Sequence, residues 1–95
     1  MIHHIVLFSL KPKADPGKAA ETFAELEELL KGCPSVMQFA VSKVMPHRAD
    51  KFQYVQFSSF EDMDGIETWR RMPEHEEMRK KLIAISKFEV VDYEV

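Results

Sequence analysis

The opening stretch IHHIVLFSL, which runs from Ile2 to Leu10, decides the fold of the chain. Most of its residues are β-branched or large and apolar, which is typical of a β-strand. Even-numbered residues point to one face of such a strand and odd-numbered residues to the other. Apolar side chains occur in both sets, with His4 in the first and His3 in the second. A strand that is apolar on both faces must be covered on both faces.

Three more strands and two or three helices follow in the pattern of apolar residues. The expected strands are 36–45, 51–59 and 87–95, and the turn 46–50 makes the first two a hairpin. A helix is expected from Pro16, with Asp15 as its N-cap and Gly32 at its end. A second helix is expected after Ser59, which would cap it together with Asp62. Pro73 restricts the residue before it and begins a further helix.

The order β-α-β-β-α(α)-β favours an α+β fold of the ferredoxin-like type in a single domain, residues 1–95. Four strands would form one antiparallel sheet with the helices on one face. The other face would then leave apolar side chains in water, which marks an association surface. We therefore expect a homodimer in which two sheets pack face to face.

Composition limits the classes of partner. The net charge is −3 and the isoelectric point is about 5.8, so no global basic field would attract nucleic acid or a membrane surface. The chain has one cysteine, Cys33, which rules out an internal disulfide. The first residues lack the pattern of a secretory signal, and no apolar run is long enough to span a bilayer. We expect a soluble cytoplasmic protein.

Two histidines are the candidate catalytic residues. His75 lies in the first turn of the expected last helix, where the helix dipole keeps an imidazole neutral and able to accept a proton. His4 lies on the expected first strand among apolar neighbours, so it needs a polar partner. In the alternative, structural interpretation, His75 packs against Met78 and His4 bonds a backbone carbonyl.

Other chemistries have little support in the sequence. His3 and His4 point to opposite faces of the strand, and His47 lies in a turn. No metal motif is present, and no glycine-rich phosphate loop is present, so we expect neither a metal nor a cofactor. The basic runs 70–71 and 79–81 alternate with acids and are typical of solvated helix faces.

Four segments resemble the stress-responsive A/B-barrel (Dabb) family. The family's first strand is similar to residues 4–11, its second-strand start to residues 34–36, and its strand-to-helix passage to residues 54–60. Residues 69–75 are similar to its Tyr-x-x-His-Pro-x-His pattern, which is followed by a strand with an acidic residue, here Asp92. The resemblance spans nearly the whole chain and implies a protomer that pairs into a dimeric α+β barrel.

The resemblance also implies site residues. A plant subset of the family cyclises polyketides with a first-strand histidine and the second histidine of the pattern, which here correspond to His4 and His75. Trp69 stands in place of the family's tyrosine, Met72 in place of the pattern's first histidine, and Tyr54 at another polar strand position. We interpret Tyr54, Trp69 and Met72 as ligand-binding residues.

Our main hypothesis is a dimer that binds a small hydrophobic or aromatic molecule between sheet and helices. His75 and His4 would transfer protons there without a cofactor, in cyclase- or isomerase-like chemistry. One alternative is a non-catalytic, stress-related or structural dimer, in which side chains fill the space between sheet and helices. Another alternative is a cofactor-free monooxygenase, which rests on shared architecture alone.

Overall fold

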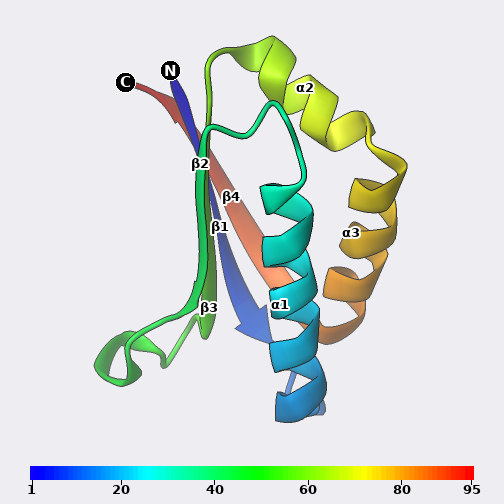
Figure 1. The fold of residues 1–95 in the computed structure, drawn as a ribbon. Coiled ribbons are helices and arrows are strands. Elements are labelled where there is room, and N and C mark those ends of the chain that lie inside the picture. Colours follow the sequence, from blue (N-terminus) through cyan, green and yellow to red (C-terminus); the bar gives the residue numbers. More distant parts are fainter.

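The computed structural model describes all residues from Met1 to Val95, and it has a four-stranded antiparallel sheet with the helices on one face (Figure 1). The strand order is β2-β3-β1-β4. This arrangement confirms the predicted ferredoxin-like α+β fold. The elements are β1 (Ile2–Leu10), α1 (Pro16–Lys31), β2 (Gln38–Lys43), the 3₁₀ turn η1 (Pro46–Arg48), β3 (Tyr54–Phe60), α2 (Met63–Arg71), α3 (Pro73–Ile85) and β4 (Ser86–Glu94).

The strand β1 lies in the middle of the sheet and pairs with both β3 and β4. Its register places Val6 opposite Gln56 on one side and Val90 on the other. The pairing with β4 joins the two ends of the described chain, from Ile2 opposite Glu94 to Leu10 opposite Ser86. The opening strand is therefore the scaffold against which the rest of the sheet is built.

The helix boundaries follow local capping chemistry. Asp15 caps α1 by accepting a hydrogen bond from the Lys18 N–H, as expected. The expected cap of α2 at Ser59 is wrong, because Ser59 is still in β3 and Asp62 accepts the bond from the Gly65 N–H instead. Met72 has extended backbone angles between α2 and α3, as the following Pro73 requires.

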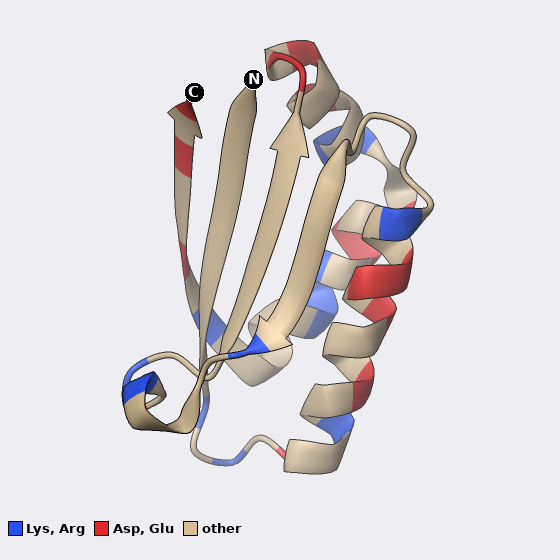
Figure 2. Cartoon of the chain, turned by 60° about the vertical axis from the view of Figure 1, so that its left-hand side comes forward, with Lys and Arg blue, Asp and Glu red and all other residues tan.

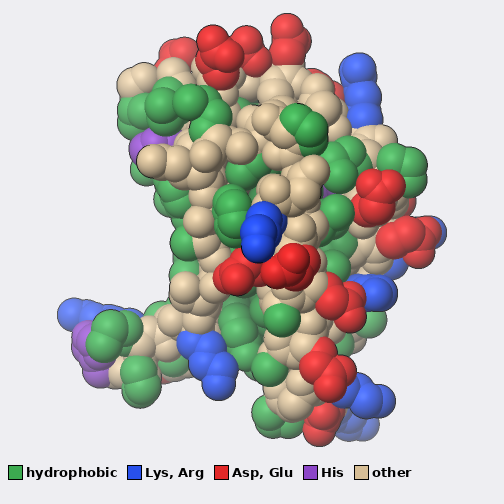
Figure 3. Space-filling model, in the orientation of Figure 1, with side chains coloured by type: hydrophobic (Ala, Val, Ile, Leu, Met, Phe, Trp, Pro, Cys, Tyr) green, Lys and Arg blue, Asp and Glu red, His purple; other side chains and the backbone are tan.

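The hairpin between β2 and β3 differs from the prediction. The strand expected over 36–45 is shorter, from Gln38 to Lys43, and the one expected over 51–59 is Tyr54–Phe60. The expected turn contains the short helix η1, and the whole segment projects from the body of the molecule (Figures 1 and 3). His47 lies on this projection and is exposed, as expected for a loop residue.

The core lies between the sheet and the helices. Phe8 from β1 and Phe60 from β3 are fully buried there, together with Leu26 of α1 and Trp69 of α2. Phe8 packs edge-on against Phe23, whose ring stacks on Tyr54 at 3.9 Å between centroids. This layer fixes the three helices on the sheet. No helix is both long and apolar enough to cross a bilayer.

The opposite face of the sheet carries no helix (Figure 1). Ile5 and Leu7 of β1, with Val55 and Phe57 of β3, are only half-buried, since no other element packs on them. Apolar residues on the edge strand β4 are more exposed to solvent; Val91 is 50% exposed. Figure 2 shows that charged residues on the sheet lie on β4 and at strand ends, so the centre of this open sheet face is uncharged. Both faces of β1 are thus apolar, as the sequence indicated.

Candidate functional site

A cavity of about 390 Å³ lies between the sheet and the helices. Strands β1, β3 and β4 form one wall, and α1, α2 and α3 form the other. Its apolar lining is supplied by Val6, Phe8, Ile66, Met78, Leu82 and Phe88, among others. His4 and His75 both line it, from opposite walls. A largely apolar cavity with a few convergent polar groups is the usual form of a small-molecule site.

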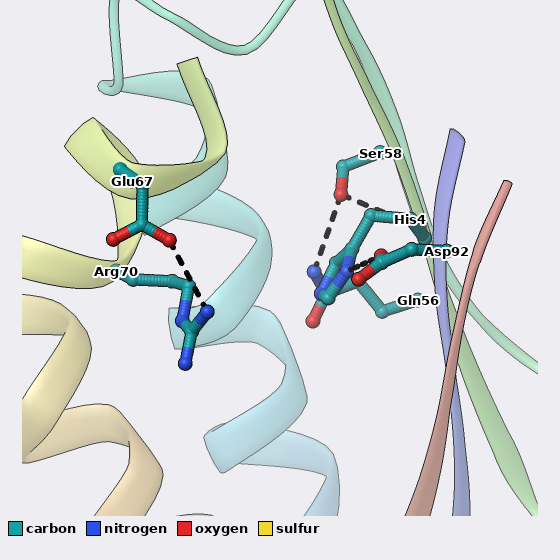
Figure 4. Close-up of polar contacts among 6 residues, drawn as sticks. All are labelled: His4, Gln56, Ser58, Glu67, Arg70 and Asp92. Atoms are coloured by element: carbon teal, nitrogen blue, oxygen red, sulfur yellow. Dashed lines mark hydrogen bonds and ion pairs between the residues drawn. The ribbon is translucent and has the colours of Figure 1, made fainter. Parts of the chain in front are cut away.

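His4 projects from the sheet wall and is held by Asp92. The β1–β4 register places the two residues opposite each other, and the distance from His4 Nδ1 to Asp92 Oδ1 is 2.5 Å (Figure 4). An ionised carboxylate only accepts hydrogen bonds, so the Nδ1–H of His4 donates to Asp92. The bond fixes the tautomer and the ring orientation, and leaves Nε2 as the nitrogen available to a ligand. The side chain of His4 is only 13% exposed.

Gln56 and Ser58 of β3 complete the polar part of the sheet wall. The Gln56 Nε2 donates to Ser58 Oγ at 3.5 Å, and the Ser58 hydroxyl donates to the backbone oxygen of His4 at 3.4 Å (Figure 4). Both side chains are buried, and Gln56 lines the cavity. Gln56 was not predicted as a site residue from the sequence. It could have been noticed in the sequence, because Gln56 and Ser58 are polar residues on a strand face that otherwise carries core residues.

His75 projects from the first turn of α3 on the helix wall. Its ring meets Trp69 edge-on at 4.8 Å between centroids, and its Nδ1 is buried without a hydrogen-bond partner. Burial lowers the pKa of His75, and the electrostatic effect of His4 lowers it further. The Glu76 carboxylate raises this pKa, whereas Arg70 and Arg79 lower it. The imidazole is therefore neutral near pH 7 and able to accept a proton.

The lowered pKa of His75 predicts a pH-dependent stability. Below the ordinary histidine pKa of about 6.5, the unfolded chain binds a proton more readily than the folded chain. The free energy of unfolding should therefore fall as the pH is lowered from about 7 to about 5. In urea titrations, His75→Gln should remove part of this fall, whereas His47→Gln in the exposed hairpin should leave it unchanged. Equal pH dependence in wild type and His75→Gln would contradict the prediction.

The three residues expected to bind ligand lie in different places. Trp69 lines the cavity beside His75. Tyr54 is buried in the core, stacked on Phe23, and Met72 packs against the core at the junction of α2 and α3. Neither Tyr54 nor Met72 is among the residues that line the cavity.

Two basic residues have a role that the sequence pattern did not indicate. Arg70 and Arg79 lie on solvated helix faces, as expected, and they also line the cavity. Both are exposed overall, so they stand at its rim. The neighbouring Arg71 and Lys80 are exposed and do not line it, as the pattern indicated.

Solved structures share this fold at low sequence identity. A dimeric ferredoxin-like protein of unknown function from Thermobifida fusca aligns with a TM-score of 0.89 and 17% identity, over 99% of this chain and 90% of that chain. The hydroxynitrile lyase from Passiflora edulis aligns with a TM-score of 0.87 and 20% identity, over 99% and 92%. The cofactor-independent oxygenase SnoaB from Streptomyces nogalater aligns with a TM-score of 0.81 and 16% identity, over 99% and 91%.

Sequence comparison gives the family more directly. No curated protein matches the chain. The family described as Stress responsive A/B Barrel Domain matches residues 2–95, which is nearly the whole sequence. That match agrees with the segments whose resemblance was noted along the sequence and with the observed fold. The chain therefore belongs to the stress responsive A/B barrel domain family.

Proposed function

We propose that this protein is a homodimer that binds a small hydrophobic molecule and catalyses proton transfer on it without a cofactor. The observation that carries the proposal is the cavity with an imidazole in each wall, His4 from the sheet and His75 from the helices. A purely structural dimer would have no need of an open cavity that holds two histidines.

His75 is the proposed base. Its pKa is lowered mainly by burial, so the ring is neutral at pH 7, and its Nδ1 has no hydrogen-bond partner within the chain. It would remove a proton from the bound molecule and return it later in the reaction, so that no external reactant is consumed. A positioned general base contributes roughly 10²- to 10⁴-fold to a rate.

His4 is proposed to orient the reacting group. Asp92 holds the Nδ1–H, so the Nε2 lone pair can accept a hydrogen bond from a hydroxyl of the ligand. Gln56 extends the polar side of the sheet wall next to it (Figure 4). Apolar side chains on the remaining walls exclude water, which strengthens the polar contacts to the reacting atoms.

The open sheet face supports the proposed homodimer. A second copy would cover Ile5, Leu7, Val55 and Phe57 at the usual spacing of about 10 Å between packed sheets. The structural neighbour from Thermobifida fusca is described as dimeric, which agrees with this arrangement. The cavity lies on the helix side of the sheet and stays accessible in such a dimer.

Base-catalysed ring opening of 5-nitrobenzisoxazole tests the proposal. The base removes the carbon-bound proton, the N–O bond breaks, and a coloured nitrophenolate forms. The wild type should show saturable catalysis, and His75→Gln should lower kcat by about 10²-fold. The rate should fall in acid with a midpoint below the ordinary histidine pKa, since burial lowers the pKa of His75.

The exposed His47 provides the matched control, because His47→Gln removes an imidazole outside the cavity. That variant should keep the wild-type rate. A wild type no faster than the same concentration of free imidazole, or an unchanged rate in His75→Gln, would refute proton transfer and favour the non-catalytic dimer.

A further inference from the structure

The rim of the cavity carries two arginines that the proposed chemistry does not use. Arg70 comes from the end of α2 and Arg79 from the middle of α3. In Figure 4, Arg70 lies on the helix side and faces the group formed by His4, Gln56 and Asp92 across the intervening space. The Arg70 guanidinium thus faces the polar part of the sheet wall across the cavity, and Arg79 lines the same cavity from α3.

The positive charge at this rim is poorly compensated. Arg79 makes no ion pair with any carboxylate of the chain. Arg70 pairs with Glu67 at 3.3 Å, but its side chain is 62% exposed, and such surface pairs contribute little stability. Asp92 is the sole carboxylate in the cavity lining, and its Oδ1 is occupied by His4.

The positive charge of both arginines also acts on the cavity, since each arginine contributes to lowering the pKa of His75. A neutral ligand would leave the Arg79 guanidinium without an ionic partner, whereas an anion at the rim would pair with it. The planar guanidinium fork matches a carboxylate with two parallel hydrogen bonds.

We propose that the cavity selects small hydrophobic monocarboxylates. The apolar body lies against Phe8, Ile66 and Leu82, and the carboxylate lies at the rim between Arg70 and Arg79. This inference rests on the proposed ligand site and names the class of molecule that the site takes. It does not depend on His75 acting as a base.

The test uses the single tryptophan of the chain, Trp69, which lines the cavity and reports binding by its fluorescence. The probes are 4-phenylbutyrate and its neutral counterpart 4-phenylbutanamide, which have nearly the same shape. The carboxylate should bind the wild-type protein at least about tenfold more tightly than the amide, as expected for charge-assisted hydrogen bonds. In the Arg70→Gln/Arg79→Gln variant this preference should disappear, with binding of the amide unchanged.

The matched control is Arg71→Gln/Lys80→Gln, which removes the same charge from the same two helices outside the cavity. It should keep the preference for the carboxylate. Equal binding of both probes to wild type, or an equal loss in both double variants, would overturn the inference while leaving the ligand site intact. If neither probe changes the Trp69 fluorescence at millimolar concentration, both the proposed ligand site and this inference are wrong. A preference that survives in a catalytically inactive His75→Gln supports the inference and refutes only the proton-transfer role.

Discussion

Replacing Phe57 by glutamate should convert the proposed dimer into a monomer. Phe57 lies near the centre of the open sheet face, opposite Ile5 on β1 and Ala40 on β2. In a dimer whose sheets face each other, every interface would bury two such carboxylates away from water. Each costs several kcal/mol, so the dissociation constant should rise by at least about 10³-fold.

Sedimentation at micromolar concentration measures this change directly, and circular dichroism checks that the variant is folded. Ala20→Glu is the control, because it adds the same charge on an exposed position of α1 and should remain dimeric. If Phe57→Glu does not fold, Val91→Glu tests the same face from the edge strand β4, where the side chain is 50% exposed. A monomeric wild type, or a dimer that tolerates both glutamates, would contradict the proposed interface.

Replacing Phe8 by alanine should lower the free energy of unfolding by about 3 to 5 kcal/mol, the usual cost of removing a buried phenylalanine ring. Phe8 is 1% exposed, and its ring contacts those of Phe23 and Phe88. It also lines the cavity, so the truncated side chain would enlarge the space available to a ligand. The destabilisation reflects both the lost apolar contact and the void left behind.

Urea unfolding at a fixed protein concentration measures this loss, since the stability of a dimer depends on concentration. Phe52→Ala makes the same chemical change in the projecting hairpin, where the ring is half-buried near Lys51. It should cost about 1 kcal/mol. Similar losses in both variants would show that Phe8 does not anchor the helices on the sheet.

The fold was predictable because its deciding signals are local. The two apolar faces of residues 2–10, the Asp15–Pro16 helix start and the break at Pro73 each reflect backbone or solvation preferences that neighbours seldom override. The ends of β2 and β3 were less predictable. Val36 and Met37 have strand-like side chains, but the regular pairing of β2 with β3 begins only at Gln38, opposite Ser59.

The candidate site was only partly predictable. His4 and His75 could be selected because an imidazole on an apolar face is unusual, and the cavity brings both together. Arg70 could not be distinguished from Arg71 along the sequence, since both alternate with acids. Which of them reaches the cavity depends on how α2 packs on the sheet. Asp92 was visible as an acidic residue on the last strand, but its contact with His4 follows from the β1–β4 register.

That register has a consequence for folding. His4 and Asp92 are 88 positions apart in the sequence, and nothing local brings them together. Strand pairs this distant must overcome a large loss of chain entropy before their contacts stabilise them, which slows folding. The sheet wall is complete only once residues 86–94 have left the ribosome and docked beside β1. A growing chain that has formed the β2–β3 hairpin and all three helices still lacks Asp92, the carboxylate that orients His4.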